Sequence, residues 1–247
     1  MSISGQTALV TGAGGGIGRA IALHLADAGV RVILVGRNRD KLEATQAALG
    51  SRAEAAIVAT CDVTERAQVA SMVQAVLATV GRVDILICNA GVNTPQRSLR
   101  SLDPEDWDRL IATNLTGAFN VVHFVLPSMR ERGCGLVIQI CSLSGLRASA
   151  VSGAAYSASK AAQAALGVCI GREERGRGIR SSVICPGEVA TAFLEGRGPR
   201  PGGGDASRRQ MLLQPEDVAA AVRFIAELPP RAHVPELVIK PTVDDFA

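Results

Sequence analysis

The fold of this chain is decided by the stretch Thr7-Ala-Leu-Val-Thr-Gly12-Ala-Gly-Gly-Gly16-Ile-Gly18. Its apolar beginning predicts a strand, and the apolar residues at helical spacing that follow it predict a helix, which Gly29 ends. Backbone N–H groups in such a turn, together with the helix N-terminus, can bind a pyrophosphate. Glycine is needed because a Cβ would keep the ligand away from the backbone. The candidate contacts for a nucleotide are Gly12, Gly14, Gly15, Gly16, Ile17 and Gly18.

The alternation of strand and helix patterns continues along the whole chain. Apolar, β-branched runs that predict strands lie at 7–11, 31–35, 55–60, 83–88, 136–141, 180–185 and 237–240. Apolar residues at helical spacing lie at 17–28, 39–49, 65–80, 103–131, 155–175 and 215–227. Continuous apolar strands separated by helices indicate a parallel sheet that is covered on both faces. We therefore expect one α/β domain over residues 1–247, with a doubly wound parallel sheet.

Composition argues against several other classes of protein. A net charge of +3 and a pI of about 8.6 are too mild for a surface that binds nucleic acid. No apolar run approaches the roughly 20 residues that cross a bilayer, and no leader precedes the first strand, so a cytoplasmic protein without a membrane partner is expected. The six cysteines and three histidines show no Cys-x-x-Cys pair and no ligand spacing, so no metal site or disulfide is expected.

A second motif is Tyr156-Ser-Ala-Ser-Lys160, which contains the only tyrosine of the chain and one of its three lysines. In a helix, a spacing of four residues places both side chains on one face. A phenol is a poor acid or base at neutral pH until something stabilises the phenolate. An ammonium about 4 Å away, at an effective dielectric constant near 20, contributes roughly 4 kcal/mol of such stabilisation. Lys160 would therefore make Tyr156 a usable proton donor or acceptor.

Further motifs occur together with these two. They are Cys88-Asn89-Ala90-Gly91, Asn114, Ser142 and Pro186-Gly187, and the glycine turn has the spacing Gly-x-x-x-Gly-x-Gly. In this order and spacing the motifs resemble those of the short-chain dehydrogenase/reductase family, over essentially the whole chain from Thr7 to about Pro241. The family more usually has asparagine where this chain has Cys88. The resemblance implies a single Rossmann domain that binds a nicotinamide dinucleotide and carries out oxidation or reduction.

The resemblance also implies the roles of four residues. Ser142 and Tyr156 would hydrogen-bond the substrate oxygen, and Tyr156 would donate or accept the proton. Ser144 is the alternative to Ser142, since the family spacing to the tyrosine falls around both positions. Lys160 would stabilise the phenolate and hold the ribose of the nicotinamide. Asn114 lies inside a long predicted helix, where asparagine is a poor choice, which indicates a purpose such as holding a water.

The end of the second predicted strand bears on the choice of cofactor. In dinucleotide-binding folds an acidic residue near this point binds the ribose hydroxyls and repels a 2′-phosphate. This chain has Gly36 and then Arg37, whose unopposed guanidinium would suit the phosphate of NADP(H). NADP(H) is therefore the expected cofactor, although Gly15 stands where many NADP-binding members have a second basic residue. The cofactor contacts implied by the resemblance are Asp62, Val63, Asn89, Ala90, Gly91, Tyr156, Lys160, Pro186, Gly187, Val189 and Thr191.

These features together predict an NADP(H)-dependent enzyme that interconverts a small-molecule carbonyl and a secondary alcohol. Members of the family usually assemble as homodimers or homotetramers through the helices at 103–131 and 155–175. One alternative is a 3-oxoacyl carrier-protein reductase, although the tail at 236–241 lacks the Val-x-Gly-Gly ending common in that branch. The arginines that could dock an acidic carrier are Arg130, Arg132, Arg172, Arg175 and Arg177. The other alternative is a regulator that binds NADP(H) without turnover, against which the complete catalytic set argues.

The segment 196–205, within the loop at about 190–212, is rich in glycine and proline and cannot sustain regular structure. It follows Thr191, so we expect a mobile lid over the nicotinamide. Such a lid would supply Phe193, Leu194 or Met211 to the substrate pocket. A surface loop without that role is the alternative.

Overall fold

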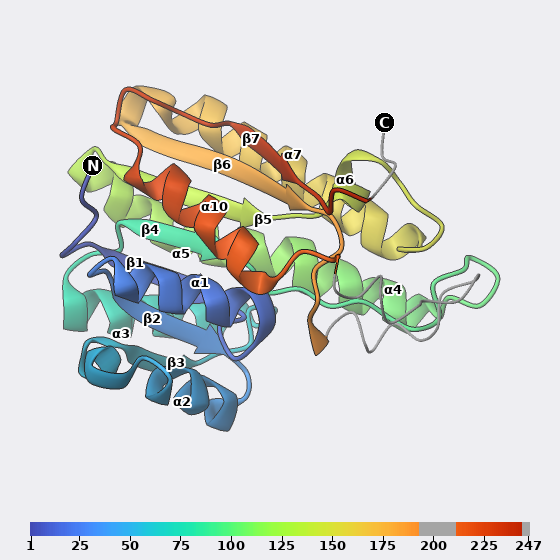
Figure 1. Cartoon of the computed structure of the whole chain (residues 1–247), viewed down its shortest axis with the longest axis horizontal. Helices are drawn as coiled ribbons and strands as arrows, with labels where there is room; N and C mark the ends of the chain where they lie inside the picture. Colours follow the sequence, from blue (N-terminus) through green and yellow to red (C-terminus); the bar gives the residue numbers. More distant parts are fainter. Residues whose placement is uncertain (193–210, 244–247) are drawn as a thin grey trace.

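A seven-stranded parallel sheet runs through the centre of the molecule (Figure 1). The structure is a computed structural model and describes residues 1–192 and 211–243. The strands are β1 Thr7–Thr11, β2 Arg31–Gly36, β3 Ile57–Thr60, β4 Ile85–Cys88, β5 Gly135–Ile140, β6 Ile179–Pro186 and β7 Glu236–Ile239. They lie side by side in the order β3-β2-β1-β4-β5-β6-β7, and every pair is parallel. Each strand lies at a predicted apolar run, so the predicted fold class is confirmed.

Helices cover both faces of this sheet (Figure 1). The bounds are α1 Gly16–Asp27, α2 Arg39–Ala47, α3 Arg66–Val80, α4 Pro104–Ile111, α5 Gly117–Arg132, α6 Leu143–Leu146, α7 Ala154–Glu174 and α10 Pro215–Glu227. One hydrophobic core lies between the sheet and α1, α2 and α10, and a second lies between the sheet and α3, α5 and α7. This is the two-sided cover that continuous apolar strands require.

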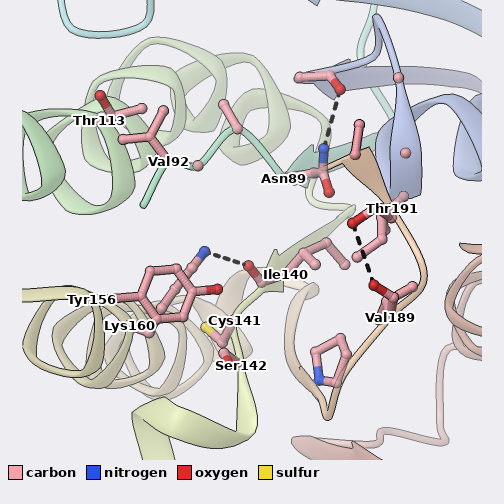
Figure 2. A pocket seen from close by; sticks show the side chains of 18 of the residues that line it. Asn89, Val92, Thr113, Ile140, Cys141, Ser142, Tyr156, Lys160, Val189 and Thr191 are labelled. Atoms are coloured by element: carbon pink, nitrogen blue, oxygen red, sulfur yellow. Dashed lines mark hydrogen bonds between the residues drawn. The ribbon is translucent and has the colours of Figure 1, made fainter. Parts of the chain in front are cut away.

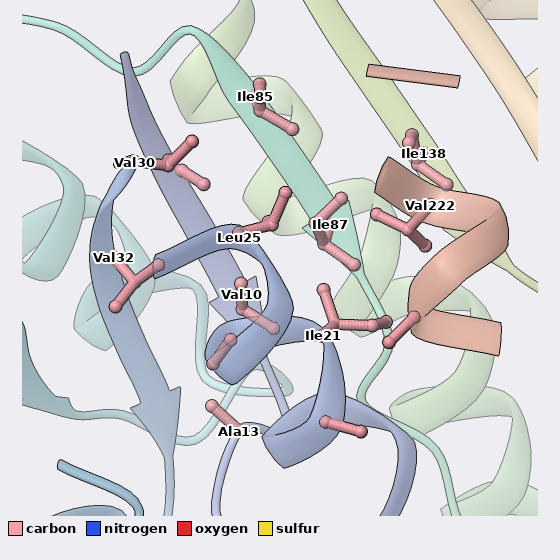
Figure 3. Packing of buried hydrophobic residues seen from close by; sticks show 14 of the residues in the cluster. Val10, Ala13, Ile21, Leu25, Val30, Val32, Ile85, Ile87, Ile138 and Val222 are labelled. Atoms are coloured by element: carbon pink, nitrogen blue, oxygen red, sulfur yellow. The ribbon is translucent and has the colours of Figure 1, made fainter. Parts of the chain in front are cut away.

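Successive strand residues face opposite cores, which explains why the strands are apolar throughout. Val10 of β1 belongs to the core under α1, whereas its neighbour Leu9 belongs to the core on the other face. Figure 3 shows Ile21 and Leu25 of α1 beside Val10, with Val222 of α10 in the same cluster. Burying a side chain of this size stabilises the fold by about 1.5–3 kcal/mol. The packing fixes the end of β1 and the start of α1, where the glycine turn lies.

The helix predicted over 103–131 contains a change of pitch. A π-helical turn, η2 Ala112–Thr116, joins α4 to α5 without a loop. Such turns insert one extra residue into a helix and are frequent at functional sites. Here the turn places the fully buried side chain of Asn114 beside the segment that follows β4. Hydrophobic periodicity predicts the helix but does not resolve a single inserted residue.

The helical stretch Pro104–Arg132 has the length and composition of a helix that could cross a membrane. The expectation that no stretch is long and apolar enough is therefore too strict. Half of its apolar window is buried inside the fold, where α5 contributes to the core shared with α3 and α7. Core helices meet the same criterion, so the stretch does not by itself indicate a membrane.

Two differences from the predicted elements lie near the strand ends. A 3₁₀ segment, η1 Gly50–Ala55, takes the start of the run predicted as a strand from 55, so β3 begins at Ile57. The four-residue helix α6 follows β5 and was not predicted. All strands end at one edge of the sheet. The chain adds β2 and β3 on one side of β1 and then crosses back to add β4 on the other side, so the direction of winding reverses between β1 and β4. Ligands of open α/β sheets bind at such a switch point.

Candidate active site

A cavity of about 570 Å³ opens at the carboxyl edge of the sheet, where β1 and β4 lie side by side. It is lined by the segments that follow strands β1 to β6. The predicted site residues in its lining are Gly12, Gly14, Gly15, Gly16, Ile17, Arg37, Asp62, Val63, Asn89, Ala90, Gly91, Ser142, Tyr156, Lys160, Pro186, Gly187, Val189 and Thr191. Gly18 and Asn114 are the two predicted site residues that are not in the lining.

The glycine turn forms one wall of the cavity. Gly12 and Gly16 have φ angles of +67° and +50°, which glycine tolerates better than other residues. A Cβ on Gly15 would meet no atom within 4 Å, so the backbone there faces open space. Gly18 has a different role, because a Cβ there would lie 2.3 Å from the carbonyl oxygen of Gly12. The turn therefore fits a pyrophosphate, and Gly18 allows α1 to pack against it.

Asn89 and Thr11 brace this turn from β4. The hydroxyl oxygen of Thr11 accepts hydrogen bonds from the N–H of Asn89 at 2.9 Å and of Ala90 at 3.0 Å. The Asn89 amide Nδ2 donates to the carbonyl oxygens of Thr11 at 2.9 Å and Gly12 at 3.3 Å. Figure 2 shows the Asn89 side chain at the edge of the cavity, directed away from Tyr156. Its amide is committed to holding the ends of β1 and β4 together.

The predicted proton-transfer residues lie across the cavity from the glycine turn (Figure 2). Tyr156 and Lys160 lie one turn apart on α7 and are only 6% and 3% exposed. The Lys160 Nζ lies 6.0 Å from the centroid of the Tyr156 ring. Gly145 allows α6 to approach α7 closely, because a Cβ there would lie 2.8 Å from the carbonyl oxygen of Lys160. The close approach of α6 brings Ser142, its N-cap, to the same wall.

Ser142 and Ser144 both line the cavity, but their hydroxyls are engaged differently. The Ser142 Oγ accepts a hydrogen bond from the N–H of Ser144 at 3.2 Å, so its own proton is available to donate. The Ser144 Oγ lies 2.6 Å from the Oγ of Ser152, which commits one of the two hydroxyl protons to that contact. This arrangement favours Ser142 as the residue that meets a substrate oxygen.

The side chain of Asn114 is held by three hydrogen bonds. Its Oδ1 accepts from the N–H of Val92 at 2.7 Å, and its Nδ2 donates to the carbonyl oxygen of Val92 at 3.0 Å. The same Nδ2 donates to the Ser159 Oγ at 2.9 Å, and Asn114 is fully buried. Both amide protons are therefore used. The side chain clamps the loop after β4 to α7. That Asn114 also helps to hold a water stays a prediction.

Two cations lie at the opposite end of the cavity, after β2. The Arg37 side chain is 67% exposed, and its Nη1 lies 3.9 Å from the Asp62 Oδ2. The prediction of an unopposed guanidinium is therefore wrong, although an exposed pair of this length contributes little. Lys41 of α2 also lines the cavity, and its Cβ would lie 3.0 Å from a Cβ on Gly14.

The segment after β6 forms the remaining wall. The Thr191 Cγ2 would lie 3.3 Å from a Cβ on Gly16, so this segment reaches the glycine turn. The Ala190 N–H donates to the carbonyl oxygen of Leu213 at 2.8 Å, which holds the two ends of the intervening segment together. Met211 is 46% exposed and is not in the cavity lining. The predicted lid at 196–205, with Phe193 and Leu194, lies outside the described residues.

Three thiols interact electrostatically with Lys160 from the ends of neighbouring strands, those of Cys88, Cys141 and Cys185. Burial raises the pKa of Cys88 to about 12. A hydrogen bond with Cys185, together with burial, raises the pKa of Cys141 well above its usual value. These two thiols are therefore neutral at physiological pH.

Within residues 1–192 and 211–243, no group of three or more His, Cys, Asp or Glu side chains is arranged to hold a metal ion.

Comparison with known proteins identifies the family. Residues 6–201 match the family model described as short chain dehydrogenase. An uncharacterised oxidoreductase of Staphylococcus aureus (strain MW2) is 33% identical over 239 residues, which cover 97% of this chain and 98% of the relative. The chain belongs to the short-chain dehydrogenase/reductase family. It is therefore an oxidoreductase by family.

Solved structures of similar oxidoreductases have the same fold. The alcohol dehydrogenase of the archaeon Thermococcus sibiricus, complexed with 5-hydroxy-NADP, is 28% identical with a TM-score of 0.86, covering 98% of this chain and 99% of its own. The 3-ketoacyl-(acyl-carrier-protein) reductase of Brucella melitensis, complexed with NADH, is 26% identical with a TM-score of 0.87, covering 98% of this chain and 99% of its own. One of these two similar structures thus contains an NADP-type cofactor and the other contains NADH.

Sequence reasoning missed several residues of this short-chain dehydrogenase site. Lys41, Val92, Ser152 and Glu188 line the cavity, and Gln163 lies directly below Lys160. Lys41 could have been found, because it falls in the first turn of the predicted helix that follows Arg37. Gln163 also left a signal, as a glutamine among small and apolar residues of α7, three positions after Lys160. Val92 and Ser152 carry no such signal, because only the tertiary structure brings their loops to the cavity.

Proposed function

We propose that this chain is an NADP(H)-dependent oxidoreductase that interconverts a carbonyl and a secondary alcohol. The observation that carries the proposal is one cavity with a glycine turn on one wall and Ser142, Tyr156 and Lys160 on the other. The first wall suits the pyrophosphate of a dinucleotide, and the second offers a proton and two hydrogen-bond donors to a substrate oxygen.

Each of the three side chains has a defined task in this proposal. NADPH, when bound, would supply the hydride that reduces the carbonyl carbon. The hydroxyls of Ser142 and Tyr156 would hydrogen-bond the carbonyl oxygen, and Tyr156 would transfer its proton to that oxygen as the alcohol forms. The buried ammonium of Lys160 would stabilise the phenolate that remains, because attraction between charges is stronger where water is excluded. In the oxidation direction, the phenolate accepts the proton of the alcohol.

The preference for NADP(H) is supported by the two cations after β2. Arg37 is exposed and paired with Asp62 only at 3.9 Å, so a phosphate dianion could replace that partner. Lys41, which lines the cavity beside Gly14, would add a second cation in place of the basic residue that the glycine turn lacks. Phosphate binding by two cations would favour NADPH over NADH.

A carrier-protein reductase is less well supported than a reductase of small carbonyls. The Brucella neighbour favours the former, but three of the five candidate docking arginines already have partners. Arg130 and Arg177 both pair with the buried Glu174, at 2.5 and 3.4 Å. Arg132 donates to the carbonyl oxygen of Val83 at 2.6 Å. Arginines that already have partners within the chain offer less to an acidic carrier.

The experiment is to follow loss of reduced-nicotinamide absorbance with NADPH and with NADH, over a panel of ketones, aldehydes and 3-oxoacyl thioesters. We expect turnover of small carbonyls with NADPH, and a loss of at least 1,000-fold, on the order expected for removing the proton donor, in Tyr156→Phe. NADPH binding by the variant should stay within a few-fold of wild type. Tight NADPH binding without turnover of any carbonyl would favour the regulator, and preferential turnover of the thioester would favour the carrier-protein reductase.

A homo-oligomer is also part of the proposal. Phe119 of α5 and Val168 of α7 are 42% and 38% exposed, and Trp107 of α4 is 37% exposed. Large apolar side chains on neighbouring helices suit contact with a second copy of the chain. Size-exclusion chromatography with light scattering would give the mass of the assembly. A monomer at micromolar concentration would contradict the proposed homo-oligomer.

A further inference from the structure

The ammonium of Lys160 has three N–H donors, and the protein accepts two of them from below the cavity. Nζ donates to the Gln163 Oε1 at 2.7 Å and to the carbonyl oxygen of Ile140 at 2.9 Å (Figure 2 shows the second bond). Lys160 is 3% exposed, and within the described residues no carboxylate lies at ion-pair distance from its Nζ. The charge is therefore buried on neutral acceptors, of which Gln163 provides the side-chain one.

The orientation of the Gln163 amide is fixed by its neighbours. Gln163 is fully buried on α7, three residues after Lys160 and therefore on the same helix face. Its Nε2 donates to the Gln139 Oε1 at 3.0 Å and to the carbonyl oxygen of Cys88 at 3.3 Å. A reversed amide would direct N–H groups at the ammonium and an oxygen at two other oxygens. The acceptor end of Gln163 must therefore face Lys160.

The hydrogen-bonded pair of Gln163 and Gln139 leaves one buried donor poorly satisfied, on Gln139. Gln139 is fully buried in β5, and within the described part of the chain its Nε2 has no hydrogen-bond partner at standard geometry. Its side chain also interacts with the Cys88 thiol, where it partly offsets the rise in pKa that burial causes. A buried donor without a partner is destabilising, so each native example calls for an explanation. Two apolar residues would fill the same space without that penalty. The pair of amides is explained if its task is to hold the lysine rather than to stabilise the core.

We propose that Gln163 is a positioning residue for Lys160, fixed in its turn by Gln139. Gln163 accepts one N–H of the ammonium and the carbonyl oxygen of Ile140 accepts a second, so the third N–H is left for the cavity and for Tyr156. The effect on kinetics rests on the proposed carbonyl–alcohol chemistry. The effect of Gln163 on the position of the Lys160 ammonium does not depend on that chemistry. A Cβ on Gly91 would lie 3.4 Å from Nζ, so the loop after β4 confines the ammonium from the cavity side.

A pH-dependent test must consider every titratable group around Nζ. These groups are Tyr156 on the same helix and the thiols of Cys88, Cys141 and Cys185 at the ends of β4, β5 and β6. The raised pKa values of Cys88 and Cys141 keep both thiols neutral through the working range. A hydrogen bond with Cys141 lowers the pKa of Cys185, so this thiol is the cysteine whose charge the pH profiles must take into account.

Three variants separate positioning from packing. Gln163→Leu removes the acceptor at similar size, and Gln163→Glu keeps an acceptor but adds a charge. Ser181→Ala is the matched control, because the buried Ser181 Oγ donates to the carbonyl oxygen of Gly167 on α7 at 2.8 Å, in the same helix–sheet interface but away from the lysine. All three variants lose or alter a buried hydrogen bond under α7, so thermal unfolding reports the packing cost of each.

The first readout is independent of activity. The chain has three lysines, so ¹³Cε-lysine labelling gives three signals, which Lys41→Arg and Lys240→Arg assign by elimination. We expect the Lys160 signal to titrate at lower pH in Gln163→Leu and at higher pH in Gln163→Glu than in the wild type. Ser181→Ala should leave it unchanged. An unchanged Lys160 titration in both Gln163 variants would overturn the proposal, even if the wild type reduces no carbonyl.

The second readout is the pH profile of kcat for alcohol oxidation, which needs the phenolate. Gln163→Leu should lower the plateau by about 10- to 100-fold, the effect of losing a hydrogen bond to a charged group, and should move the acidic limb to higher pH. Gln163→Glu should also move the limb upward, since its carboxylate opposes the phenolate, but should keep most of the plateau. If the acidic limb of the kcat profile in Gln163→Leu matches that of the wild type, or if Ser181→Ala shifts the limb equally, Gln163 has only a packing role and the proposal is wrong.

Discussion

Replacing Asn114 by alanine tests whether its amide clamps the catalytic loop. The fully buried side chain makes three hydrogen bonds, two to the backbone of Val92 at 2.7 and 3.0 Å and one to the Ser159 Oγ at 2.9 Å. Each contributes roughly 0.5–1.5 kcal/mol net, and the partly buried groups of Val92 lose their partner. We therefore expect Asn114→Ala to lower the free energy of unfolding by about 2–4 kcal/mol.

The same change should affect catalysis more than cofactor binding. Val92 belongs to the loop after β4, which lines the cavity, and Ser159 joins the clamp to α7 and Tyr156. A loop that moves by about 1 Å can cost a hundredfold in rate. Urea denaturation at constant m-value gives the stability, and kcat with the dissociation constant of NADPH gives the functional effect.

Two further variants make the test decisive. Asn120→Ala is the control, because Asn120 is also buried on α5 and donates to the Val63 carbonyl oxygen at 3.0 Å, away from the proposed proton donor. It should lower stability with little change in kcat. Asn114→Asp should be at least as destabilised as Asn114→Ala at neutral pH, because a buried carboxylate would face the Val92 carbonyl oxygen. The stability of Asn114→Asp should increase as the pH falls, because the carboxyl group becomes neutral. The reasoning is refuted if Asn114→Ala loses less than about 0.5 kcal/mol and keeps wild-type kcat.

Three more outcomes follow from named contacts. Arg37→Ala should raise the KM for NADPH by about tenfold, since the side chain is largely exposed, and leave the KM for NADH unchanged; equal effects on both would remove the phosphate role. Gly18→Ala, whose Cβ would lie 2.3 Å from the Gly12 oxygen, should cost about 1–3 kcal/mol of stability and weaken NADPH binding, whereas Gly15→Ala should retain stability. The Arg130 guanidinium lowers the pKa of Glu174, so the pair stabilises the fold at pH values above the usual glutamate pKa, and this contribution is lost as the pH falls through the lowered pKa. The difference in free energy of unfolding between wild type and Arg130→Met should be about 1–2 kcal/mol at neutral pH and should disappear below about pH 4. A difference that grows below that pH would contradict the assignment.

The sequence by itself determined the sheet, its helices and the two motifs that face each other across the cavity. Strand and helix follow from the period of apolar residues, and the glycine turn follows from which residues tolerate its backbone angles. The pairing of Tyr156 with Lys160 is equally local, because four residues in a helix bring two side chains to one face. These features depend on neighbours in the chain, which is why they could be predicted.

The tertiary structure alone decided which side chains are committed to the protein and which are available to a ligand. Asn114 is clamped on Val92, 22 residues earlier, and Asn89 braces Thr11 across 78 residues. Arg37 meets Asp62 only because β2 and β3 are adjacent, and Gln163 meets Gln139 only because α7 lies on β5. A polar side chain of given type has many possible partners in sequence. The choice among them is made by the order of the strands and the packing of the helices on them, since a hydrogen bond needs its two atoms within about 3 Å.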